Sequence, residues 1–344
     1  MASVVHEKVK SYYSSLETGE DLQTSAACPA PSRLLSPSAK TALQQVHPDV
    51  CKRFLGCGVV VPEKLKGCSI LDLGSGSGRD CYMLSKLVGE DGHVTGIDMT
   101  SELVEASRKY IQYHQELFGY AKPNTVFLQG YMEKLGEAGI KDSSVDVIVS
   151  NCVICLCPDK RAVLREAYKV LKEGGELYFS DMYANKVVPD SFREDAVLWV
   201  DKWIFKNMSE GHKKQCDIKY ASGTYRIFKL PKHSIRSKAL VTYKGTVPDC
   251  EEHFAFDASY SFKTNLTMDV DAEMAAILQC TRFSSDFTVQ MTDEPDPSLD
   301  STRQVYHLLN PFQLADRLGS CIKQCSKTGS TAACGTKTTS GNCG

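Results

Sequence analysis

The chain has 344 residues, of which 42% are hydrophobic, so it is long enough for two domains and a large core. Its 40 Lys and Arg and 42 Asp and Glu leave a formal net charge of −2, which excludes the strongly basic surface of a nucleic-acid-binding protein, and no apolar run reaches membrane-spanning length. The first residues resemble neither a signal peptide nor an Arg-rich presequence, so we expect a cytoplasmic protein with neither nucleic acid nor membrane as a partner.

The first 60 residues are predicted to hold a helix over residues 5–16 and a Pro-rich loop around Cys28 that closes over a site. The alternative is a disordered tail. Cys57 lies between two glycines, directly ahead of the first apolar strand pattern, and a thiol in such a segment is accessible to ligands.

An apolar run at 70–73 leads into the glycine-rich segment 74–78, and a helical pattern covers 80–88. This order predicts a strand, a tight turn and a helix, in which glycines let the backbone bend and approach a ligand. The next strand, 93–97, ends in Asp98, whose carboxylate is suited to accept two ribose hydroxyls. The pattern is typical of a nucleoside-cofactor site in a doubly wound α/β fold.

The spacing of the glycines and the acid before them indicate which cofactor binds. Glycines at 74, 76 and 78 differ from the GxGxxG pattern of dinucleotide sites, and no Gly-Lys-Ser/Thr follows them as in a Walker-type phosphate site. Asp72 would repel a pyrophosphate, but it suits the cationic amino-acid end of S-adenosylmethionine. We therefore predict S-adenosylmethionine; the alternative is a turn that only connects the strand to the helix.

Further strands are predicted at 125–130, 145–152 and 176–181, the last after a helix over 160–171. Glu133 follows the third strand, where it can meet the amino group of an adenine. Strands that alternate with helices predict a parallel sheet with ligands at the carboxyl ends of its strands.

Beyond residue 230 the pattern changes to short alternating stretches, at 239–243 and 254–262, which predict antiparallel strands, with a short helix over 271–278. From about Met291 the chain turns acidic and is predicted to be a linker. The Ser/Thr/Gly/Lys-rich tail from 320 is expected to be disordered.

Fifteen cysteines are many for such a protein, and their odd number argues against a complete disulfide framework. Their spacing is a poor match to the paired CxxC motifs of structural zinc sites. We expect four to be small buried hydrophobic residues, Cys68, Cys81, Cys250 and Cys280, and five to be accessible thiols, Cys28, Cys57, Cys152, Cys155 and Cys157.

Several thiols around a methyl-donor pocket imply a soft, thiophilic methyl acceptor. Trivalent arsenic fits, because it binds two or three thiolates and keeps a lone pair that can attack a sulfonium methyl group. No proton leaves the attacking atom, so this chemistry needs no general base.

Taken together, the motifs resemble those of the animal arsenite methyltransferases. The resemblance rests on residues 56–58, 72–82, 96–99, 130–135, 150–153 and 174–181. It runs from about residue 12 to 199 and resumes from about 225 to 312. It implies a class I methyltransferase with a Rossmann-like sheet, a smaller α+β C-terminal domain and a Cys-rich flexible tail.

The resemblance also implies the site residues. Arsenite would be bound by the catalytic thiols of Cys57 and Cys152, with Cys28 as a further arsenic ligand. The predicted cofactor-binding residues are Asp72, Gly74, Ser75, Gly76, Gly78, Asp98, Met99, Met132, Glu133 and Asn151. The substrate would be arsenite or its glutathione conjugate, and a thiol reductant, thioredoxin or glutathione, would complete turnover.

The chain departs from the family pattern after Trp199. There the family has a Gly-rich turn with another arsenic-binding cysteine, followed by a helix and a strand. In this chain the corresponding segment, residues 200–216, is shorter and polar, and Cys216 is a poor substitute for the missing cysteine. We expect the sheet to lose a strand, so that residues 225–228 form an exposed edge, and the activity to be weakened. Leu55 replaces a Tyr that the family tends to have near the methionine end of the cofactor.

We therefore expect an N-terminal helix and lid (1–60), a methyltransferase domain (61–230), an α+β domain (231–312) and a tail (313–344). Two alternatives to an active arsenite methyltransferase stay open. One is a catalytically impaired, splice-type variant that binds arsenic and cofactor. The other is a methyltransferase for another small molecule, which would need a base near the pocket.

Overall fold

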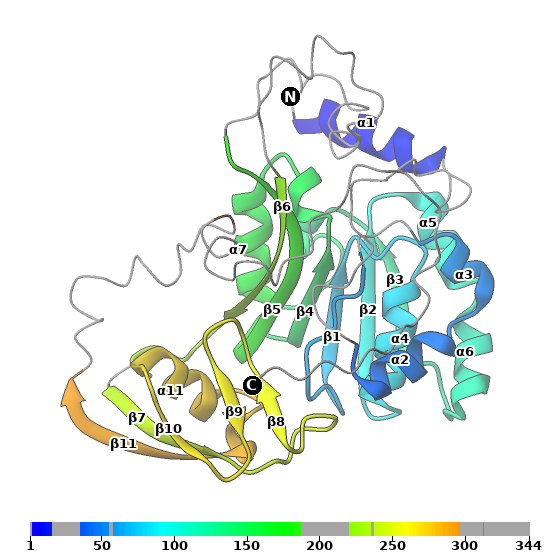
Figure 1. Ribbon diagram of the computed structural model, residues 1–344. Coiled ribbons are helices and arrows are strands. Elements are labelled where there is room, and N and C mark those ends of the chain that lie inside the picture. The colour runs from blue at the N-terminus through cyan, green and yellow to red at the C-terminus, as the bar shows by residue number, and fades with distance from the viewer. Residues whose placement is uncertain are drawn as a thin grey trace, which may run out of the picture.

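A six-stranded sheet forms the centre of the larger domain (Figure 1) in the computed structural model, which describes residues 2–15, 35–54, 58–186, 220–234, 237–295 and 312. Its strand order is β3-β2-β1-β4-β5-β6, and only the β5–β6 pair is antiparallel. The strands are β1 (Ser69–Leu73), β2 (His93–Asp98), β3 (Thr125–Gln129), β4 (Val145–Asn151), β5 (Leu171–Ala184) and β6 (Tyr220–Phe228). The prediction of a class I methyltransferase sheet is confirmed.

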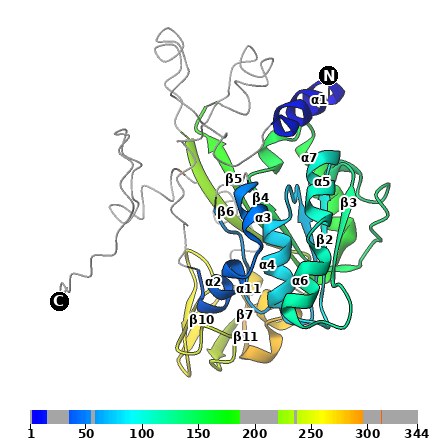
Figure 2. The same ribbon diagram turned by 90° about the vertical axis from the view of Figure 1, so that its right-hand side faces the viewer.

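Helices cover both faces of this sheet (Figure 2). They are α2 (Pro37–Gln44), α3 (Pro48–Lys52), α4 (Arg79–Val88), α5 (Ser101–Arg108), α6 (Ile111–Phe118) and α7 (Lys160–Val170), whereas α1 (Ala2–Ser14) lies above one end of the strands. Alternate residues of β1 serve the two faces: Ile70 packs with α2 and α4, whereas Leu71 packs with α7. None of the helices within these described ranges is long and apolar enough to cross a bilayer.

Short polar residues set where several helices begin. The Ser36 side chain accepts a hydrogen bond from Ala39 N at the start of α2, and Asp159 accepts one from Ala162 N at the start of α7. Asp271 does the same for α11 (Ala272–Cys280) in the smaller domain. The helix predicted over 271–278 is therefore confirmed, with its acid as the cap.

The smaller domain, yellow and orange in Figure 1, packs α11 on a three-stranded sheet of order β10-β7-β11. Its strands are β7 (Ser237–Tyr243), β10 (Thr267–Val270) and β11 (Phe287–Pro295), with a separate hairpin of β8 (His253–Ala255) and β9 (Ser261–Lys263). The linker predicted from Met291 is wrong, because Met291 pairs with Ala239 and β11 continues to Pro295. An edge strand tolerates a terminal proline, so the composition alone does not distinguish such a strand from a linker.

Strand β5 begins five residues earlier than predicted. Leu171 pairs with Val145 directly after α7, and the ladder shifts register before Glu176 pairs with Val147. Gly174, at φ +78°, donates its N–H to the carbonyl of Lys229 at 2.7 Å. The glycine turn is thus part of the strand pairing rather than a loop ahead of it.

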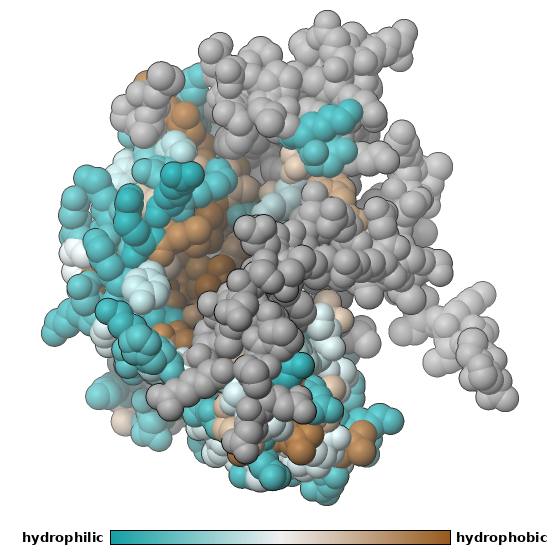
Figure 3. Space-filling view, turned by 90° about the vertical axis from the view of Figure 1, so that its left-hand side faces the viewer, coloured by the Kyte–Doolittle hydropathy of each residue, from teal (hydrophilic) through white to brown (hydrophobic). Residues whose placement is uncertain are grey.

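Strand β6 is the last strand of the described sheet. Ile227 keeps 47% of its surface exposed there, and Figure 3 shows hydrophobic surface on the side of the molecule that carries β6 and α7. Within the described residues β6 is thus the edge strand expected at 225–228, although Ile227 is the one residue of these four that is exposed. The altered segment itself, at 200–216, lies outside the described residues.

A buried ion network joins the two domains. The Glu176 carboxylate, fully buried on β5, contacts Arg226 Nε of β6 at 2.6 Å and Arg282 Nη2 of the smaller domain at 2.5 Å. Arg226 also reaches Glu63 at 3.2 Å, and its guanidinium lies 4.1 Å from the ring centroid of Phe256. Burial by itself would raise the pKa of Glu176, but the two guanidinium charges outweigh it and hold that pKa below its usual value.

Candidate functional site

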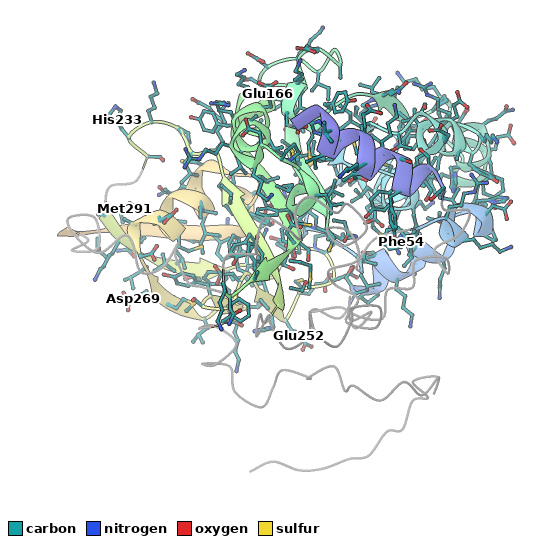
Figure 4. All side chains as sticks on the ribbon, turned by 90° about the horizontal axis from the view of Figure 1, so that it is seen from above. Phe54, Glu166, His233, Glu252, Asp269 and Met291 are labelled. Atoms are coloured by element: carbon teal, nitrogen blue, oxygen red, sulfur yellow. The ribbon has the colours of Figure 1, made fainter. Side chains whose placement is uncertain are left out.

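A cavity opens at the carboxyl ends of β1, β2 and β4, where a parallel α/β sheet binds ligands. It has about 1000 Å³ of empty space, its open mouth included, and is lined by residues from α1 through to the turn after β4. Figure 4 looks down on this end of the sheet and shows α1 lying across the ends of the strands, with Phe54 labelled near α1. All predicted cofactor-binding residues except Gly78 line the cavity.

The glycine turn shapes the cavity wall. Gly74 has φ +70°, and a Cβ there would lie only 2.4 Å from Cγ1 of Val153. Gly78 has φ +87° and precedes α4, where a Cβ would meet the Phe127 ring at 2.8 Å. Gly78 therefore sets the strand-to-helix turn, and Gly74 keeps the loop against the segment after β4.

Two carboxyl groups, the buried Asp72 and the half-buried Asp98, give the cavity an acidic character. Asp98 accepts hydrogen bonds from Gly76 N at 2.9 Å and Thr100 N at 2.8 Å, and burial nevertheless raises its pKa. Asp72 accepts one from the Cys81 thiol at 3.2 Å. Burial, followed by the charge of Asp80, raises the pKa of Asp72 well above its usual value. A cationic ligand would relieve this unmatched negative charge.

Two buried polar atoms of the cavity lining have no hydrogen-bond partner within the part of the chain that the structure describes: Ser75 Oγ and Asn151 Oδ1. Buried polar atoms normally have partners, so these two indicate a polar ligand. The amide nitrogen of Asn151 is used differently, donating to Asp80 at 3.0 Å and to the Gly58 carbonyl at 3.1 Å.

Cys152 lines the cavity at the end of β4 in a strained conformation. Its φ is +57°, in the left-handed region that a non-glycine residue rarely adopts, and its N–H donates to the Ser180 carbonyl at 2.8 Å. Strain of this kind concentrates at functional sites. The sequence pattern placed Cys152 at this end of the sheet, but it gave no sign of the strained backbone.

Replacing Cys152 by glycine and by alanine separates this strain from the thiol. Both changes remove the sulfur, but only glycine adopts φ +57° without steric cost, so Cys152→Gly is expected to be about 1 kcal/mol more stable than Cys152→Ala. Urea denaturation of the two variants measures the difference. Equal midpoints would show that the backbone relaxes once the thiol is gone.

The other two predicted arsenic ligands, Cys28 and Cys57, lie outside the described residues, as does Leu55. The residue directly after Cys57 is described: the Gly58 carbonyl accepts hydrogen bonds from Asn151 at 3.1 Å and from Arg79 at 2.5 Å. The chain on the C-terminal side of Cys57 is therefore anchored next to Asn151, the neighbour of Cys152.

The structure corrects the prediction for two cysteines. Cys155 and Cys157 were expected to be accessible thiols, but both are buried, because the short helix η2 (Ile154–Leu156) turns them inward. Cys157 still borders the cavity. Cys68 and Cys81 are buried as predicted, whereas Cys250 and Cys280 are only half-buried.

Glu133, which also lines the cavity, lies on the short helix η1 (Met132–Lys134). Its Oε1 accepts a hydrogen bond from the Cys157 thiol at 2.7 Å and lies 2.7 Å from His6 Nε2 of α1. Burial, followed by Glu133, raises the pKa of Cys157, so this thiol is protonated at neutral pH. Sequence reasoning missed His6, because nothing in a helix 127 residues away indicates that it meets Glu133.

Comparisons with known proteins agree with this fold and site. A family model described as a methyltransferase domain matches residues 64–230, and one described as the arsenite methyltransferase C-terminal domain matches 236–343. An arsenic(III) S-adenosylmethionine methyltransferase from Chlamydomonas reinhardtii, known from its crystal structure, aligns with a TM-score of 0.69 and 34% identity, over 76% of this chain and 98% of that one.

Two curated relatives match almost end to end. The arsenite methyltransferases of Homo sapiens and Rattus norvegicus are each 41% identical, over 97% and 96% of both chains, respectively. The human alignment runs over 365 positions, more than the 344 residues here, so it places gaps in this chain. With this identity over nearly its whole length, the chain belongs to the arsenite methyltransferase family.

Proposed function

We propose that this protein transfers methyl groups from S-adenosylmethionine to trivalent arsenic bound by its thiols. The products would be monomethylated and, after a second transfer, dimethylated arsenicals, as a step of arsenic detoxification in the cytoplasm. The observation that carries the proposal is the position of Cys152, which has a strained backbone and lines the cavity directly after Asn151, whose amide oxygen has no partner among the described residues.

The cavity fits S-adenosylmethionine. Asp72 would face the ammonium end, Asp98 the ribose hydroxyls and Glu133 the adenine, while Ser75 Oγ and Asn151 Oδ1 offer hydrogen bonds that the described protein does not use. When bound, the cofactor supplies an electrophilic methyl group. The protein's part is to hold this group and to exclude water from it.

The thiols would orient the arsenic substrate. Each Cys–S–As bond forms as a thiol displaces an arsenic-bound hydroxyl group, which leaves with the thiol proton as water, or displaces a glutathione thiol. Cys152 would act with Cys57 and Cys28, and the arsenic lone pair needs no base. A thiol reductant, thioredoxin or glutathione, would restore trivalent arsenic and reduced cysteines between turnovers.

Incubation of the purified full-length chain with arsenite, S-adenosylmethionine and a thiol reductant tests the proposal, with arsenic species separated by chromatography and detected by mass. Methylated arsenic is the expected result. No arsenical product from protein that still binds the cofactor would favour the impaired variant. Methylation of a different acceptor, unaffected by loss of the thiols, would favour another small-molecule methyltransferase.

The Asp98→Asn variant should bind S-adenosylmethionine about ten to a hundred times more weakly, because a charged acceptor of ribose hydroxyls is worth about 1.5–3 kcal/mol. Isothermal titration calorimetry measures the loss. The matched control is Asp91→Asn, on the exposed turn before β2, which should bind as the unaltered chain does. Equal affinities for Asp98→Asn and the control would mean that this carboxylate does not contact the cofactor.

A further inference from the structure

Three side chains of different chemistry meet at the Glu133 end of the cavity. His6 comes from α1, Glu133 from η1, and Cys157 follows η2, so the group joins the N-terminal helix to two turns of the sheet domain. One imidazole nitrogen, one carboxylate oxygen and one sulfur all lie within 4.8 Å of one another. None of the three belongs to the predicted arsenic-binding set.

The donor set is that of a zinc-type site. Imidazole, thiolate and carboxylate are the usual zinc ligands, and three protein ligands with an open fourth position are a common arrangement. Hard cations such as Mg²⁺ and Ca²⁺ prefer sites made of oxygen atoms alone. This site could not be predicted from the sequence, because its ligands do not form the paired cysteine motifs by which zinc sites are found.

Two of the three donor pairs need to open only slightly to hold a cation, and the third pair, His6 and Cys157, lies within 4.8 Å. Zinc–ligand bonds of 2.0–2.3 Å in a tetrahedron separate neighbouring donor atoms by about 3.3 to 3.6 Å. Glu133 Oε1 lies 2.7 Å from both His6 Nε2 and Cys157 Sγ, so these pairs must open by less than about 1 Å. The His6 and Glu133 side chains are only 19% and 11% exposed, which limits competition from water.

We propose that His6, Glu133 and Cys157 bind Zn²⁺ or a similar soft divalent cation, and that this cation competes with the cofactor. On binding, the Cys157 S–H bond breaks, a sulfur–metal bond forms and the proton passes to solvent; no electrons are transferred. The metal replaces the hydrogen bonds that Glu133 makes to the other two residues. The cation site stands on the cluster alone, whereas the competition rests on the proposed function, in which Glu133 faces the adenine.

The cation site is tested with Co²⁺ added to the metal-free, reduced full-length chain. A thiolate-to-cobalt charge-transfer band with tetrahedral visible bands is expected, and Cys157→Ser and His6→Ala should each weaken Co²⁺ binding at least about tenfold. The control is Cys250→Ser, which removes a half-buried thiol of the smaller domain and should leave the spectrum unchanged. Thermal unfolding of each variant verifies that it is folded.

If Cys157→Ser and His6→Ala bind Co²⁺ as tightly as Cys250→Ser does, the site is refuted and other thiols bind the metal. Competition is measured by titrating S-adenosylmethionine with and without Zn²⁺. The apparent Kd should rise with Zn²⁺ in the unaltered chain and in Cys250→Ser, but not in Cys157→Ser. If Zn²⁺ leaves the apparent Kd of the unaltered chain unchanged, the competition is refuted. If the unaltered chain does not bind S-adenosylmethionine even without metal, this result counts against the proposed function but not against the cation site.

Discussion

The Cys152→Ser variant is expected to lose arsenic methylation, with kcat/KM lowered at least about a hundredfold. A serine hydroxyl stays protonated at neutral pH and is a hard ligand, so it binds trivalent arsenic poorly and leaves it badly placed for methyl transfer. The change is small in volume, and the thiol lies on the cavity wall rather than in the core, so the fold should persist. The rate of appearance of monomethylated arsenic measures the effect.

The variant's affinity for S-adenosylmethionine distinguishes lost chemistry from lost structure. It should match that of the unaltered chain, because the thiol of Cys152 is not among the predicted cofactor contacts. Cys250→Ser serves as a matched control with the same substitution at a distant, half-buried thiol, and it should retain full activity. Turnover by Cys152→Ser close to that of this control would exclude Cys152 as an essential arsenic ligand.

The second large effect concerns stability: Glu176→Ala should lower the free energy of unfolding by about 3–5 kcal/mol. The change leaves Arg226 and Arg282 without the fully buried carboxylate that both contact. Urea denaturation measures the loss. The control is Glu137→Ala, whose carboxylate pairs with Lys134 at 3.1 Å but is 72% exposed, and it should cost less than about 1 kcal/mol.

The same pair of variants predicts a difference in pH dependence. The two guanidinium groups hold the pKa of Glu176 in the folded protein below its unfolded value of about 4.3. The ionised carboxylate therefore contributes fully to the free energy of unfolding above that pH, and this contribution is lost as the pH falls through the lower pKa of the folded protein. The unaltered chain should therefore lose more stability below about pH 4 than Glu176→Ala does. If the free energy of unfolding depends on pH in the same way for the two proteins, Glu176 is not charged in the folded protein.

Much of the larger domain could be predicted from local sequence. Strands β1 to β4 and the helix after the glycine turn were predicted within a few residues, because their apolar runs end in glycine or polar residues. The limits of β5 and β11 were not, since both depend on pairing with partners elsewhere in the chain. Helices α2 and α3 had not been singled out, although Ser36 and two prolines mark where they begin.

The residues of the site could be predicted where they belong to a sequence motif. Asp72, Asp98 and Asn151 lie at the carboxyl ends of neighbouring strands, so their convergence follows from the topology. The burial of Cys155 and Cys157 was not predictable, because one turn of η2 decides which way their thiols point. The approach of His6 to Glu133 depends on the packing of α1, which leaves no trace in either local pattern.

The ion network around Glu176 has a consequence for how the protein can be divided. A fragment ending after β6 would keep Glu176 and Arg226 but lose Arg282 and the Phe256 ring on which the Arg226 guanidinium packs. It would leave a buried charge cluster open to water on one side, so the sheet domain is not self-sufficient. The two domains are therefore expected to unfold in one cooperative transition, and neither could be exchanged for a foreign counterpart without a matching set of charges.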